Sequence, residues 1–135
     1  MIRAIAQSDD LEDVTVVLVG GRGNQPRIEE YRQTTQSGDQ IVMAGEVQSI
    51  YPYYAAADFF VLPSREEGLP VVLLEAMAAQ CPIVSTEIPS ITNVVTDQET
   101  ALLVPPKNPS QLATAINKIS SDSDLSENLS QRAYD

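Results

Sequence analysis

Two glutamates in one short segment have the clearest chemical potential in this sequence. Glu67 and Glu75 lie in SREEGLPVVLLEAM, residues 64–77, where most of the other residues are apolar, glycine or proline. A carboxylate buried among apolar side chains is costly unless a donor or a cation pairs with it. Carboxylates also accept hydrogen bonds well from the neighbouring hydroxyls of a sugar. The pair therefore has either a structural role or a role in binding a hydroxylated ligand.

A predicted helix positions these two carboxylates. Pro70 favours the first position of a helix, so we expect the helix from about residue 70 to residue 80. Glu67 then lies in the loop just before the helix, and Glu75 lies in its second turn. The two carboxylates are thus expected on either side of the helix N-terminus.

The N-terminus of this helix offers donors for an anion. The unfilled amides near Gly68, Leu69 and Val71, together with the helix dipole, suit a phosphate. A side chain at position 68 would crowd an approaching ligand. Because phosphates repel carboxylates, Glu67 and Glu75 are better placed for hydroxyls on either side of a diphosphate. A nucleotide sugar has that arrangement, with the sugar at one end and the ribose at the other.

A structural role for the two carboxylates also fits the spacing. In that case Glu75 pairs with Arg65 or with a backbone donor, and Glu67 only caps the helix. Spacing does not decide between the two roles, so both stay open at this point.

Short apolar segments alternate with helical ones along the chain. We expect strands at residues 14–20, 40–45, 59–64, 81–86 and 100–106, and helices at 2–6, 27–36, 48–58, 70–80 and 108–120, with a weaker helix starting near residue 124. This alternation predicts an α/β fold, a Rossmann-like three-layer α/β/α arrangement with a parallel sheet of about five strands. Ligands of such sheets bind outside the carboxyl ends of the strands, which here are the loops 20–26, 45–48, 63–69, 86–92 and 105–108.

The composition excludes several classes of function. The chain has 135 residues, enough for one domain at most, and 43% are hydrophobic. Its 19 acids, 8 bases and no histidine give a formal charge of −11, which argues against nucleic acid and anionic membranes as partners. Without histidine there is no Ser–His or Cys–His nucleophile pair and no His/Cys zinc cage. We expect no metal site, no membrane span and no signal peptide.

The single cysteine, Cys81, has no partner for an internal disulfide. It precedes Pro82 and an apolar run, so we interpret it as a small buried hydrophobic residue and not as a reactive thiol. A reducing cytoplasm is the compartment that this cysteine usage predicts.

Two further motifs give weaker signals. Residues 20–23, Gly-Gly-Arg-Gly, follow a strand, but Gln25-Pro26 stand where a dinucleotide fingerprint needs its third glycine. A glycine turn is favoured there over a phosphate contact. Asp122-Ser123-Asp124 matches the acid–x–acid pair of many metal-dependent transferases, yet Asp124 with Glu127 fits a capping box better.

The segment around the two glutamates resembles a known signature. PSREEGLPVVLLEAMAAQCPIVST, residues 63–86, is similar to the donor-binding segment of retaining glycosyltransferases with the GT-B fold, especially family 4, the glycosyl transferases group 1. Glu67 and Glu75 match the E-x7-E motif of that family. The segments 14–23, 41–64 and 99–116 also resemble its successive elements. The likeness covers about residues 1–120 in register.

The resemblance implies a role for each matching position. Glu75 would bind the ribose hydroxyls, and Glu67 would act on the transferred sugar as the catalytic candidate. The other residues expected to bind the substrate are Gly68 and Leu69 through their amides, Glu46 and Val47 beside the base, and Gly21 and Ser64. The substrate would be a UDP-, GDP- or ADP-sugar, with no cofactor and no metal. Residues 1–120 would form a partial nucleotide-sugar-binding domain, and 121–135 a polar tail with a short helix.

The sequence also departs from the family pattern. It lacks an acceptor-binding domain, and it lacks the donor domain's first strand, which ends in Gly-Arg and is followed by a lysine. Arg22, Arg65 and Lys107 match neither of those bases, and Ala101 stands where the family usually has glycine. In the usual strand order 3-2-1-4-5-6 that first strand is central. The strands at 14–19 and 59–62 would therefore pair directly, leave a gap, or accept a strand from another chain.

These features predict the donor-binding domain of a retaining glycosyltransferase that transfers a hexosyl group to an acceptor. On its own, the chain is expected not to turn over a donor. The open edge predicts a homodimer or a separate acceptor-binding half as partner. The alternative is a non-catalytic nucleotide-binding or assembly module that pairs with another chain. A nucleotide-sugar isomerase fits less well, because it would need catalytic bases that this sequence lacks.

Overall fold

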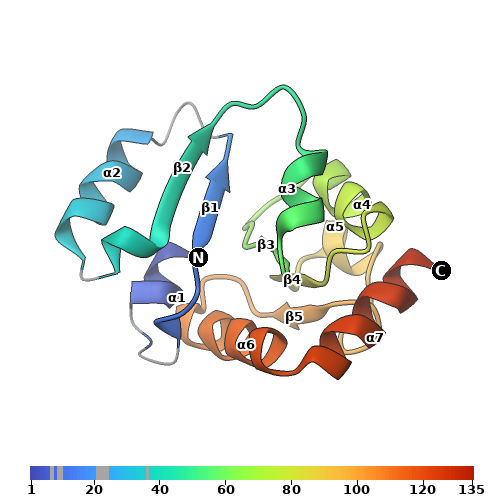
Figure 1. Ribbon diagram of the computed structural model, residues 1–135. Helices are drawn as coiled ribbons and strands as arrows, with labels where there is room; N and C mark the ends of the chain where they lie inside the picture. The colour runs from blue at the N-terminus through green and yellow to red at the C-terminus, as the bar shows by residue number, and fades with distance from the viewer. Residues whose placement is uncertain (7, 9–10, 21–24, 36) are drawn as a thin grey trace.

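The fold alternates helices and parallel strands. The computed structural model describes residues 1–6, 8, 11–20, 25–35 and 37–135 (Figure 1). Along these residues the elements are α1 (Ile2–Ala6), β1 (Val16–Val19), α2 (Gln25–Thr34), the 3-10 helix η2 (Gly38–Gln40), β2 (Ile41–Gly45), α3 (Tyr51–Ala56), β3 (Phe60–Leu62), α4 (Val71–Ala78), β4 (Ile83–Thr86), α5 (Pro89–Thr92), β5 (Leu102–Val104), α6 (Pro109–Ser121) and α7 (Ser123–Tyr134).

The five strands form two parallel sheets instead of one. β1 pairs with β2, with Val16 beside Ile41, and β3, β4 and β5 pair in that order, with Val84 beside Leu102. The α/β class and the parallel pairing are therefore confirmed. The single sheet is not, because no pairing joins β1 to β3 within the described residues. Direct pairing of β1 with β3 is therefore wrong, while a gap and a strand from another chain both stay predictions.

Two clusters of buried side chains hold the layers together. The first cluster joins α1, β1, β4, β5, α6 and α7 and includes Ile5, Val16, Val84, Leu102, Ile116 and Leu129. The second cluster joins α3, α4, β4 and α5 and includes Tyr54, Leu73, Ala76, Ile83 and Ile91. Because the first cluster contains residues from both sheets, it connects them despite the missing pairing. In Figure 1, α1 and α6 lie below the strands, while α3, α4 and α5 gather on the other side of β4.

The helix α6 shows how local chemistry sets an element. The Asn108 side chain accepts a hydrogen bond from the Gln111 amide at 3.1 Å, and Pro109 occupies the first turn. Leu112, Ile116 and Ile119 are buried on one face. The cap, the proline and the apolar stripe agree with the prediction for residues 108–120.

The bounds and caps of two helices differ from the prediction. The segment expected as the loop 86–92 contains α5, which fully buried Ile91 anchors in the second cluster. The cap of α7 is Asp122, whose side chain accepts from the Leu125 amide at 2.9 Å, so the capping role belongs to Asp122 and not to Asp124. Leu129 of α7 lies in the first cluster, so this helix packs against the domain.

No described helix combines the length and the apolar character that a membrane crossing needs.

Candidate functional site

A chain of hydrogen bonds fixes the loop that leaves β3. The buried Thr86 hydroxyl at the end of β4 donates to the Ser64 carbonyl at 2.5 Å. The Ser64 hydroxyl in turn donates to Glu67 Oε1 at 2.5 Å. Glu67 is only partly exposed, and its carboxylate has a defined orientation because Ser64 is itself held. The structure thus brings Ser64 and Glu67 together, and one oxygen of Glu67 is bonded within the protein.

The start of α4 offers fewer free donors than the sequence predicts. α4 begins at Val71, one position after the expected first helical residue, and Pro70 is its N-cap. The Val71 amide donates to the Leu69 carbonyl at 2.9 Å, so it is not available to a ligand. Among the described residues, the amides of Gly68 and Leu69 have no acceptor. A Cβ at Gly68 would meet nothing within 4 Å, so the protein leaves open space at this position.

Glu75 reaches a partner that lies far away in the sequence. The Tyr54 hydroxyl of α3 lies 3.3 Å from Glu75 Oε2 and 3.0 Å from the Val72 carbonyl of α4. Within the described part of the chain no ion pair joins Glu75 to Arg65, so that part of the structural alternative is wrong. Glu75 itself is exposed, and its partner Tyr54 is buried, with 4% of its surface accessible.

Tyr54 was missed by sequence reasoning. Helical spacing relates residues within one element, whereas Tyr54 and Glu75 are 21 positions apart on two helices. The available signal was the Tyr-Tyr-Ala-Ala-Ala-Asp run at residues 53–58, which lies in a segment resembling the glycosyltransferase signature.

Burial changes the acidity of two groups near α4. Desolvation, followed by the charge of Glu75, raises the pKa of Tyr54 to about 12, so its hydroxyl stays protonated at neutral pH. Desolvation, followed by the charge of Asp58, raises the pKa of Cys81 to about 11. Cys81 is 2% exposed and lies in the second cluster, which confirms that it is a buried hydrophobic residue.

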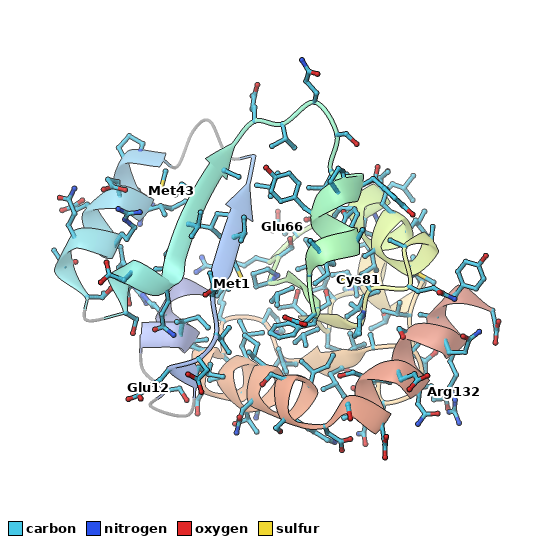
Figure 2. All side chains as sticks on the ribbon, in the orientation of Figure 1. Met1, Glu12, Met43, Glu66, Cys81 and Arg132 are labelled. Atoms are coloured by element: carbon cyan, nitrogen blue, oxygen red, sulfur yellow. The ribbon has the colours of Figure 1, made fainter. Side chains whose placement is uncertain are left out.

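The residues expected beside the base lie on the other sheet. Glu46 and Val47 follow β2, where Gly45 has a φ of 69° and accepts a hydrogen bond from the Gly20 amide at 2.7 Å. They are therefore at the carboxyl end of β2, while Ser64, Glu67 and Glu75 follow β3. Figure 2 shows Glu66, the neighbour of Glu67, in the region between β1 and α3. Gly21 lies outside the described residues.

The described residues contain no group of three or more His, Cys, Asp or Glu side chains arranged to hold a metal ion. The described groups around the start of α4 are two carboxylates with hydroxyl partners, Glu67 and Glu75, and the amides of Gly68 and Leu69.

Comparison with known proteins decides the family. The profile of the family described as glycosyl transferases group 1 matches residues 1–122. The chain belongs to the glycosyl transferases group 1. It is similar to the lipopolysaccharide core biosynthesis mannosyltransferase LpsB of Rhizobium meliloti, with 35% identity over 95 residues, 64% of this chain and 27% of that protein.

Solved structures of glycosyltransferases share the fold. The crystal structure of the C-terminal domain of a glycosyl transferase group 1 family protein, LpcC of Francisella tularensis, matches with a TM-score of 0.84 and 28% identity, covering 98% of this chain and 73% of that chain. HepE of Anabaena, solved in complex with UDP, matches with a TM-score of 0.86 and 25% identity, covering 98% of this chain and 38% of that chain. This group 1 chain therefore has the Rossmann-like fold of the C-terminal domain of GT-B glycosyltransferases.

The match covers only part of the related enzymes. The chain spans about a third or less of the length of the curated relatives that it matches. The group 1 domain described here is thus the counterpart of one portion of those proteins.

The acidity of Tyr54 predicts a specific loss of stability at high pH. The unfolded chain releases this proton near the ordinary pKa of 10.0 and the folded chain near 12. Between these values the folded state binds more protons, so the free energy of unfolding falls as pH rises. In denaturant titrations, the stability difference between the wild type and Tyr54→Phe should shrink from pH 10 to pH 12. A difference that stays constant over this range would contradict the raised pKa.

Proposed function

We propose that this domain binds the nucleotide diphosphate sugar donor of a retaining glycosyltransferase that transfers a hexosyl group to an acceptor. The observation that carries the proposal is the arrangement around α4. Two carboxylates are held by hydroxyl groups, Glu67 by Ser64 and Glu75 by Tyr54, and the free amides of Gly68 and Leu69 lie between them in the chain. The match to the E-x7-E motif of the family supports the same residues.

Each group has a role that follows from its charge. The amides of Gly68 and Leu69 donate to the diphosphate, because the start of a helix favours an anion. Glu75 accepts from the ribose hydroxyls, and Glu67 accepts from the transferred sugar, where it is the catalytic candidate. Ser64 acts through Glu67. Neither carboxylate is expected to contact the phosphates, since like charges repel at close range.

The base is proposed to lie against Glu46 and Val47 at the end of β2, and Gly21 stays a substrate-binding candidate from the sequence. UDP is the first nucleotide to test, because HepE of Anabaena was solved with UDP. GDP and ADP are the other candidates. No cofactor and no metal is proposed, and the cytoplasm is the proposed compartment, on the argument from the single buried thiol.

Transfer itself requires more than these residues. As the nucleoside diphosphate leaves the sugar, negative charge develops on its phosphate oxygen. An enzyme must stabilise that charge in the transition state. Arg65, in the loop before α4, is exposed. We therefore propose that residues 1–135 bind the donor weakly, that they do not turn it over alone, and that a second, acceptor-binding half completes the site.

A second candidate function is an assembly module. Among the residues that the structure describes, no strand pairs with the facing edges of β1 and β3, and an unpaired edge is a template for another strand. Val17 and Val42, neighbours in the register of β1 and β2, are 46% and 45% exposed, and adjoining exposed apolar side chains can belong to an interaction surface. These features favour association with a second chain, in a homodimer or with a separate partner.

Substitutions of Glu75 and Glu67 should affect the binding of different ends of the donor, the ribose and the transferred sugar. Glu75→Ala should lower the affinity for UDP about tenfold or more, because hydrogen bonds to a charged group are lost. Glu67→Gln should leave the affinity for UDP unchanged and lower the affinity for UDP-glucose by a similar factor. Isothermal titration calorimetry with UDP, GDP and ADP, with and without sugar, checks both expectations.

Glu66→Gln is the matched control, because Glu66 is exposed and adjacent to Glu67. It should change neither affinity. Absence of binding for all nucleotides, or equal losses in all three variants, would contradict the proposed donor site.

The open edge predicts self-association at high protein concentration. Light scattering should show a mass above that of one 14.7 kDa chain as concentration rises. Replacing Val17 with lysine should shift the chain toward the monomer, because a charge on an edge strand opposes pairing. A strict monomer at high concentration would count against the homodimer and leave only a different partner chain for this edge.

A further inference from the structure

We propose that Tyr54 is a positioning residue that orients Glu75 toward the ribose of the donor. This inference rests on the proposed function and extends it to a residue outside the loop and helix that carry the E-x7-E match. Its basis is the hydroxyl of Tyr54, which lies 3.3 Å from Glu75 Oε2 across the contact between α3 and α4.

The ring of Tyr54 is itself fixed. Its side chain is 4% exposed and belongs to the second cluster. It packs edge-to-face against Phe60 of β3, with ring centroids 5.3 Å apart and an angle of 82° between the planes. Because the ring is packed on its sides, its hydroxyl points in one direction, so Tyr54 offers Glu75 a hydrogen-bond donor at a fixed position.

The bond to Tyr54 leaves one carboxylate oxygen of Glu75 available. Only Oε2 is bonded to Tyr54, and the glutamate side chain is exposed. A free glutamate would lose rotamer freedom when it binds a ligand, and a side chain already oriented loses less. Tyr54 therefore improves ribose binding without touching the ribose.

The Tyr54 hydroxyl has a second acceptor. It lies 3.0 Å from the Val72 carbonyl, and a phenol has one proton to donate. A bond to Val72 alone would hold α3 against α4 whether or not a ligand is present. The two roles make different predictions for ligands that lack the ribose hydroxyls.

The experiment compares a nucleoside diphosphate with its 2′,3′-dideoxy analogue. The tightest-binding of UDP, GDP and ADP is titrated into the wild type, Tyr54→Phe, Glu75→Ala and the double variant. Tyr54→Phe should lower the affinity for the nucleotide about three- to tenfold and leave the affinity for the dideoxy analogue unchanged. In the Glu75→Ala background the same substitution should have no further effect. Tyr53→Phe, at the neighbouring position of α3, should bind both ligands as the wild type does.

Equal loss for both ligands, or a loss that persists without Glu75, would overturn the positioning role and leave Tyr54 as a packing residue. If the wild type binds the nucleotide and its dideoxy analogue with equal affinity, Glu75 does not bind the ribose hydroxyls. That result would also overturn the positioning role of Tyr54. Failure of the wild type to bind any nucleotide would overturn the donor site as a whole.

An NMR measurement on the wild type tests the same role even if Tyr54→Phe does not fold. With carbon-13 at the ζ position of tyrosine, the Tyr54 resonance should shift on addition of the nucleotide and stay in place with the dideoxy analogue. A shift of equal size with both ligands would contradict the role.

Discussion

The parallel strand β4 and its hydrogen bonds to β3 are the constraint on which the site depends. Its four residues are buried, with Ile83 in the second cluster and Val84 in the first, so the strand is covered on both faces. The Ser85 hydroxyl donates to the Leu62 carbonyl at 2.9 Å, and Thr86 holds the Ser64 carbonyl. These two side chains extend the β3–β4 pairing into the loop that carries Glu67. A buried strand thus fixes where β3 ends and where the candidate site begins.

A second consequence of this architecture is that the two glutamates are held from different sides. Ser64 orients Glu67 from the loop, and Tyr54 orients Glu75 from α3. An acidic chain with a formal charge of −11 gains little from general electrostatic attraction of a nucleotide. The proposed recognition of a donor therefore depends on local geometry: two free amides for the phosphates and two oriented carboxylates for the hydroxyls.

The sequence predicted the parts of the fold that depend on local patterns. Short apolar runs predicted the five strands, and Asn108-Pro109 with the apolar stripe that follows predicted α6. The E-x7-E spacing placed Glu67 and Glu75 around the start of α4. Such local patterns do not predict contacts between elements that are distant in the sequence. The Tyr54–Glu75 bond joins two helices, and the Val71 amide is lost to a local turn that only the backbone geometry defines. The lack of pairing between β1 and β3 is among the outcomes that the family's strand order left open, and no single segment of the sequence chooses among them.

A crystal structure of residues 1–135 with UDP-glucose bound tests donor binding most directly. We expect the ribose hydroxyls about 3 Å from the Glu75 carboxylate, the diphosphate at the amides of Gly68 and Leu69, and the glucose beside Glu67. A nucleotide sugar bound elsewhere, or bound in the reverse direction with its ribose against Glu67, would contradict this expectation.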